Sequence, residues 1–163
     1  MAKDIKEKLK HHITTINDVR VDINHIEVDL FSNDVNDPNK ISSDLNEKII
    51  ETVNIDAEIN SDYKLYLMQR RFWEAHESLE KHWKNEKNQK IKDSIRLSIQ
   101  FCAAMVHYQK CNDNIAKEIF KRAISIDSDI KLVRDIIGID LNSINSVDLN
   151  FESIIDQMMK QNH

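Results

Sequence analysis

The first thirty residues combine a short helical pattern with two alternating segments. Apolar side chains recur at helical spacing over residues 5–13, which predicts a helix at the start of the chain. Apolar and polar residues then alternate over 19–23 and over 26–30, on either side of an Asn-His pair at 24–25. This alternation predicts two half-buried strands joined by a tight turn.

The next thirty residues favour one more helix and one more strand. Pro38 lies in a polar segment that we interpret as a loop. The Ser-Ser-Asp sequence at 42–44 supplies capping side chains for a helix over 45–53, and residues 54–59 alternate again. The order helix, strand, strand, helix, strand predicts a small α+β unit over residues 1–60, whose size is low for independent stability.

From residue 61 onward the hydrophobic positions follow a helical period. Five helical stretches are expected, most of them preceded by Asp, Asn or Ser side chains that can cap a helix. They span residues 62–86, 91–110, 113–126 and 130–137, and the segment from Asn150 onward. Short connections between such helices are typical of an antiparallel bundle. The predicted fold class is therefore mainly α, with a five-helix antiparallel bundle domain over 61–163 preceded by the small α+β unit.

Composition strengthens the helical interpretation. One glycine and one proline among 163 residues leave few of the residues that tight turns require, which disfavours a β-sandwich or barrel. Charged residues make up 31% of the chain and hydrophobic residues 40%, as in ordinary globular proteins.

Charge and hydropathy limit the partners and the location that we expect. The net charge of −5 disfavours non-specific binding to nucleic acid, which depends on clustered basic residues. No segment approaches the ~20 apolar residues of a membrane span, and the first residues lack the apolar region of a secretory signal. We expect a cytoplasmic protein that does not associate with membranes. The sequence leaves open an unidentified protein partner and a homodimer.

The segment 72–83, Phe-Trp-Glu-Ala-His-Glu-Ser-Leu-Glu-Lys-His-Trp, is the most chemically suggestive part of the chain. At ~100° per residue, His76 falls on the apolar stripe with Phe72 and Trp83, and Glu80 lies at the edge of that stripe. A buried polar group without a partner costs about 1–3 kcal/mol, so both side chains are expected to find partners.

The following helix offers partners of the right chemistry. Arg96, Gln100 and His107 share one face of the 91–110 segment, with small residues beside them. A network of hydrogen bonds and ion pairs between the two helices is the plainest interpretation, because buried polar groups are normally satisfied by their neighbours. We call this expected network the polar seam.

Two chemical alternatives to a purely structural seam stay open. His76, Glu77, Glu80 and His107 are a mixed imidazole and carboxylate set that suits a divalent metal such as Zn, Mn or Fe. A di-iron centre would require further carboxylates, and Gln100 stands where one is wanted. The second alternative is general acid and base catalysis without metal, although no nucleophile motif or phosphate-binding glycine loop accompanies these residues.

The motif at 72–83, followed by Ile-Gln-Phe-Cys-Ala-Ala-Met-Val-His at 99–107, resembles the domain-of-unknown-function family 309 over residues 62–137. The resemblance implies an all-helical domain with no established activity. It also marks signature positions, which correspond here to Glu74, His76, Glu77, Glu80, Trp83, Gln100, His107 and Asn112. Family members usually carry glycines shortly before the glutamine and just before the asparagine, where this chain has Leu97-Ser98 and Cys111.

The sequence favours a non-enzymatic helical module with a structural or binding role. It leaves an enzymatic role open. Its polar seam then comprises Glu74, Arg96, Gln100, Trp83 and Asn112 beside His76. The alternative is a metal-binding protein or metal-dependent hydrolase with ligands His76, Glu77, Glu80 and His107. No catalytic residue is assigned.

Overall fold

A computed structural model describes residues 2–9, 16–22, 25–30, 36–47, 62–144 and 149–161. The described residues divide into two compact units, one formed by Met1–Glu58 with Gln109–Cys111 and the other by Ile59–Tyr108 with Asn112–His163. We call them unit 1 and unit 2. That residues 1–60 and 61–163 are separate domains stays a prediction.

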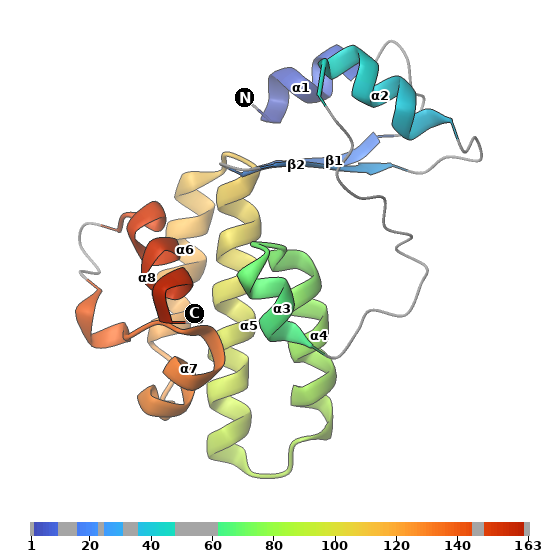
Figure 1. The fold of residues 1–163 in the computed structure, drawn as a ribbon. Coiled ribbons are helices and arrows are strands. Elements are labelled where there is room, and N and C mark those ends of the chain that lie inside the picture. The colour runs from blue at the N-terminus through green and yellow to red at the C-terminus, as the bar shows by residue number, and fades with distance from the viewer. Residues whose placement is uncertain are drawn as a thin grey trace. The chain divides into compact units, whose positions relative to one another are not determined.

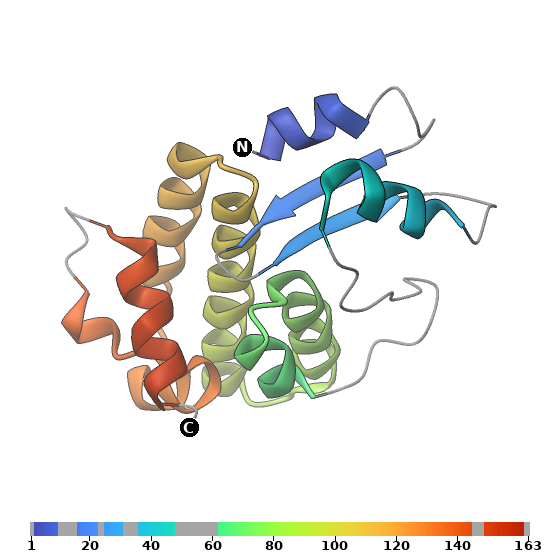
Figure 2. The same cartoon turned by 45° about the horizontal axis from the view of Figure 1, so that its top comes forward.

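Unit 1 contains two helices and a two-stranded antiparallel sheet. The elements are α1 Ala2–Leu9, β1 Ile16–Val21, β2 Ile26–Leu30 and α2 Asp37–Leu45. Both helices lie on the same face of the sheet, where Leu9 and Ile41 form a small buried core (Figure 2). The predicted hairpin is therefore confirmed, with β1 beginning three residues earlier than the alternation indicated. The predicted strand over 54–59 lies outside the described residues.

The second helix of unit 1 differs from its prediction. We expected Pro38 in a loop and residues 42–44 at a helix N-terminus, whereas α2 contains Pro38 in its first turn and residues 42–44 near its end. Proline suits the first turn because its fixed φ is already helical and because its missing N–H has no partner there in any case. The helix ends at Asn46, whose left-handed φ of 55° closes the last turn.

Unit 2 is helical throughout the part that the structure describes (Figure 1). It contains α3 Tyr63–Met68, α4 Phe72–Asn85, α5 Gln89–Gln109, α6 Asp113–Ile124, α7 Ile130–Ile137, a short 3-10 turn η1 Leu141–Ser143 and α8 Phe151–Gln161. The prediction of a mainly helical chain is confirmed. Among these described helices none is long and apolar enough to cross a membrane.

The core of unit 2 lies around α5, with α4 on one side and α6 on the other (Figure 1). A chain of aromatic rings joins the helices: Phe101 of α5 makes edge-on contacts with Phe72 of α4 and with Phe120 of α6, both at 6.2 Å between ring centroids. Phe120 then contacts Phe151 of α8 at 6.0 Å. Aromatic pairs in this geometry add to the free energy gained by burial, so this chain of rings determines how the helices dock.

The first long helix predicted for this unit is interrupted. One helix was expected over 62–86, but α3 ends at Met68 and α4 begins at Phe72. Arg70 has a left-handed φ of 58°, and the Arg71 N–H donates to the Tyr66 carbonyl at 2.9 Å. This hydrogen bond across a left-handed residue is the usual way in which a helix ends, although glycine is the usual residue there.

Cys111 ends α5 in the same way, and its left-handed conformation has a cost in folding free energy that can be tested. Its φ is 59°, and the Asn112 N–H donates to the His107 carbonyl at 3.0 Å. A side chain with a Cβ is disfavoured in this conformation, whereas glycine adopts it freely. Glycine is the residue that the family resemblance implied for this position.

We predict that Cys111→Gly raises the free energy of unfolding by about 0.5–1 kcal/mol, because the relief of backbone strain exceeds the greater flexibility of glycine in the unfolded chain. Chemical denaturation monitored by circular dichroism measures the change. Cys111→Ser keeps the Cβ and serves as the matched control, with no expected gain. Equal stabilisation by both variants would show that the thiol, and not the backbone, is responsible.

Candidate functional site

Helix α4 carries most of the residues predicted for the site. Its buried side chains are Phe72, Ala75, Ser78 and Leu79. Trp73, His76, Glu77 and Glu80 follow at the spacing that places them along one stripe of a helix, and all four are half-buried or exposed. We call these four residues the α4 outer face.

A stack of two rings is the most ordered feature of the α4 outer face. The rings of Trp73 and His76 are 5.8 Å apart between centroids and almost parallel, at 3°. His76 Nδ1 lies 3.3 Å from Glu77 Oε1, within hydrogen-bond distance. The sequence placed His76 within the apolar stripe, whereas its side chain is 19% exposed at the edge of the core. Trp73 covers one side of this imidazole.

The other predicted residues of α4 are paired within their own helix or with its nearest neighbours. Glu80 accepts a hydrogen bond from Lys84 Nζ at 3.0 Å, and Glu74 accepts one from Arg71 Nη2 at 2.7 Å. The Lys92 ammonium group lies 4.6 Å from the centroid of the Trp83 ring, which gives a cation–π contact between α4 and α5. Several polar side chains that we expected to pair across the two helices therefore have partners close to them in the sequence instead.

The predicted residues outside α4 occupy different environments. Arg96 is exposed, and Gln100 and His107 are half-buried along α5. Asn112 stands at the N-cap of α6, where its side chain accepts no capping hydrogen bond. That these residues and α4 form one polar seam stays a prediction.

The four proposed metal ligands are not gathered into a ligand set. Within the described residues, no group of three or more His, Cys, Asp or Glu side chains is placed to hold a metal ion. Of the four, the structure records His76 and Glu77 as a pair, while Glu80 pairs with Lys84. A metal site formed by His76, Glu77, Glu80 and His107 stays a prediction.

A polar cluster that the sequence did not indicate joins two helices of unit 2 to the turn before α4. The Tyr108 hydroxyl donates to Glu152 Oε1 at 2.8 Å, and Arg70 Nη2 donates to Glu152 Oε2 at 3.2 Å. Burial raises the pKa of the Tyr108 phenol above its usual range, and the hydrogen bond to the Glu152 carboxylate raises it further. Tyr108 is therefore a hydrogen-bond donor and not a proton donor at neutral pH. The cluster anchors α8 to α5 and to the turn before α4.

Sequence reasoning missed this cluster because its members are far apart along the chain. Arg70 and Glu152 are separated by 82 positions, and no local motif links them. The predicted helix over 62–86 placed Arg70 in its interior, so nothing in the sequence indicated that this arginine is buried and needs a carboxylate partner.

Comparison with known proteins gives a family match over part of the chain. No curated protein and no solved structure matches the chain. One family model does match, over a segment that runs from just before α3 into α6 and includes the whole of the α4 outer face. The resemblance predicted from the 72–83 motif is thereby confirmed: residues 61–119 match the family described as Domain of unknown function (DUF309).

Proposed function

We propose that this protein is a non-enzymatic helical interaction module whose α4 outer face contacts a protein partner. The observation that carries the proposal is the stack of Trp73 on His76. An indole that is 37% exposed is held flat against an imidazole at the surface of α4. Large aromatic side chains in such positions are enriched among the residues that dominate binding energy in protein interfaces.

The stack suits binding for two physical reasons. Part of the indole remains in water, so covering it would gain free energy in proportion to the apolar area removed from solvent. The ring is also already ordered by the imidazole, which lowers the entropy that a partner must overcome on binding. The partly exposed carboxylates of Glu77 and Glu80 lie on the same stripe and supply the polar rim that interfaces commonly have around an apolar centre.

Site-specific photo-crosslinking in the native host tests the proposal. A photoreactive amino acid replaces Glu77 in one variant, and in a control it replaces Ile115, an apolar residue that is 46% exposed on α6. We predict a discrete crosslinked species from position 77, whose yield falls at least fivefold when Trp73→Ala is added, and no such species from position 115. A second copy of this chain counts as the partner if mass spectrometry identifies it.

Two results would overturn the proposed function. One is the absence of any discrete crosslinked species from position 77. The other is the same species at similar yield from positions 77 and 115, which would indicate non-selective contact. Circular dichroism of the Trp73→Ala variant shows whether its helical content is retained, since an exposed side chain contributes little to the core.

A further inference from the structure

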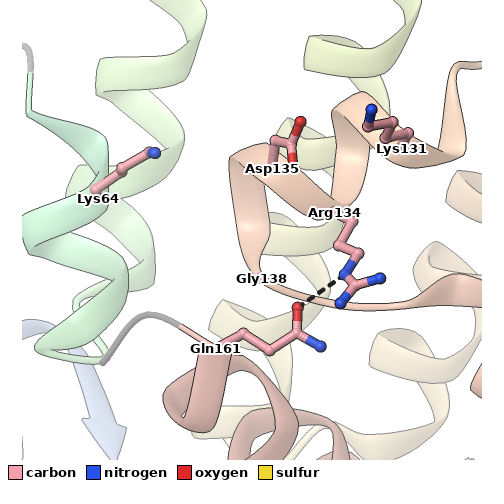
Figure 3. Close-up of a pocket in the computed structure, with 6 residues that line it drawn as sticks. All are labelled: Lys64, Lys131, Arg134, Asp135, Gly138 and Gln161. Carbon is pink, nitrogen blue, oxygen red and sulfur yellow. Dashed lines mark hydrogen bonds between the residues drawn. The ribbon is translucent and has the colours of Figure 1, made fainter.

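A surface hollow in unit 2 gathers basic side chains from two helices. It has a volume of about 540 Å³ and is lined by Lys64 of α3, by Lys131, Arg134, Asp135 and Gly138 of α7 and its C-cap, and by Gln161 of α8 (Figure 3). Figure 3 shows Lys64 projecting from α3 toward α7, and Arg134 reaching toward Gln161. The hollow is therefore bordered by cations on two sides.

The charges of this hollow are unbalanced. Three basic side chains face one carboxylate, in a chain whose net charge is −5. Lys64, Lys131 and Arg134 form no ion pair with any residue that the structure describes. All three basic side chains are exposed, and the summed field of clustered cations attracts anions to the hollow.

A favourable interaction with the helix dipole accounts for the position of only one of the three cations. Arg134 lies in the last turn of α7, where a positive charge is favourable for the helix dipole. Lys131 lies in the first turn of α7 and Lys64 in the first turn of α3, where a positive charge is unfavourable. Two of the three cations thus stand at positions that their own helices disfavour, and both border the hollow.

Arg134 is also held in a defined orientation. Its Nε donates to Gln161 Oε1 at 3.1 Å, which fixes the plane of the guanidinium group (Figure 3). A guanidinium group matches the geometry of a phosphate, because two N–H groups can donate to two oxygens of one phosphate. The lysines supply point charges for further phosphate oxygens. Gly138, the C-cap of α7, also lines the hollow.

We propose that this hollow binds a small anion carrying two or more linked phosphate groups. Arg134 contacts one phosphate, and Lys64 and Lys131 neutralise the rest of its charge. Asp135 opposes the ligand and limits its affinity. The site joins α3, inside the family-matched segment, to α7 and α8, outside it, and does not depend on the proposed contact at Trp73.

Titration of the full chain with pyrophosphate, followed by two-dimensional NMR of backbone amides at low salt, tests this site. We expect saturable shifts confined to amides around Lys64, Lys131 and Arg134. Arg134→Gln and Lys131→Gln should each weaken binding by about threefold to fivefold, as expected for the loss of one exposed ionic contact. Asp135→Asn should strengthen binding by a similar factor, and a gain in affinity cannot arise from a damaged fold.

Lys117→Gln is the matched control, because Lys117 is an exposed lysine on α6 that does not line the hollow. It should leave the affinity unchanged. The proposal is overturned if pyrophosphate produces no saturable shifts. It is also overturned if Lys117→Gln weakens binding as much as Lys131→Gln, since only the overall charge would then matter. A failure of Asp135→Asn to strengthen binding overturns it as well, since the anion would then lie away from the hollow that Asp135 lines.

Discussion

Phe101→Ala is expected to lower the free energy of unfolding by about 3–5 kcal/mol, the usual cost of removing a buried phenyl ring. Phe101 is fully buried in α5, the helix around which the core of unit 2 is arranged. Its ring contacts Phe72 on one side and Phe120 on the other, so the truncation removes both contacts and leaves a cavity between three helices. Few single substitutions in this unit would cost more.

Urea unfolding monitored by circular dichroism at 222 nm measures this effect. Ile115→Ala serves as the control, because Ile115 is a large apolar residue exposed on α6, and its loss should change stability by no more than about 0.5 kcal/mol. A cost below about 1 kcal/mol for Phe101→Ala would contradict the central position of this ring. Such a result would mean that the surrounding helices collapse into the space without loss of packing.

Helix starts in unit 2 were predictable because their signals are local. Asp129 caps α7 by accepting hydrogen bonds from the Lys131 and Leu132 N–H groups, and Asn150 accepts one from the Ser153 N–H at the start of α8. The end of α7 at Gly138 was also readable, since its φ is 71° and glycine is the common residue there. Each of these signals lies within four residues of the boundary that it marks.

The break between α3 and α4 was not predictable from the sequence. Arg70 adopts a left-handed φ that its residue type does not indicate, and for this reason the break between α3 and α4 was missed. The energy that holds it there comes from tertiary contacts, such as the pair of Arg70 with Glu152 and the contact of the Arg71 guanidinium with the Tyr66 ring. Among the described helices, three are followed by a left-handed residue other than glycine: Asn46, Arg70 and Cys111.

Periodicity alone does not predict which pairs the side chains of the candidate site form. It placed His76 on the apolar stripe of its helix and Glu80 at the edge of that stripe, whereas both side chains are half-buried and share a stripe with Trp73 and Glu77. Periodicity contains no information about which neighbour each side chain selects. Long side chains such as Glu80 and Lys84 can satisfy each other within one helix, and this local pairing competes with the interhelical network that we expected.

Glu27→Gln is expected to destabilise the hairpin of unit 1 by about 1.5–3 kcal/mol near neutral pH, the range for hydrogen bonds to charged groups. Glu27 lies directly opposite Arg20 across the two strands and accepts a hydrogen bond from its Nε at 2.6 Å. His25 Nε2 lies 3.2 Å from the other carboxylate oxygen. The amide cannot carry the negative charge that both partners favour, and it leaves the largely buried Arg20 guanidinium poorly compensated.

The same contacts set the pH dependence of this effect. Burial by itself would raise the pKa of Glu27, but the hydrogen bonds from His25 and Arg20 outweigh it and hold the pKa below the ordinary value of 4.5. A carboxylate with a lowered pKa stabilises the folded state above that ordinary value, and the stabilisation is lost as the pH falls through the folded-state pKa. The difference in stability between wild type and Glu27→Gln should therefore be greatest near neutral pH and shrink in acid.

Protection of the strand amides from hydrogen exchange measures this difference in stability for unit 1 alone. Asp29→Asn is the matched control on the same strand: Asp29 faces Asp18 across the hairpin, so removing its charge should not destabilise the strands. A Glu27→Gln effect that persisted unchanged below the folded-state pKa would show that side-chain shape, and not charge, holds the two strands together.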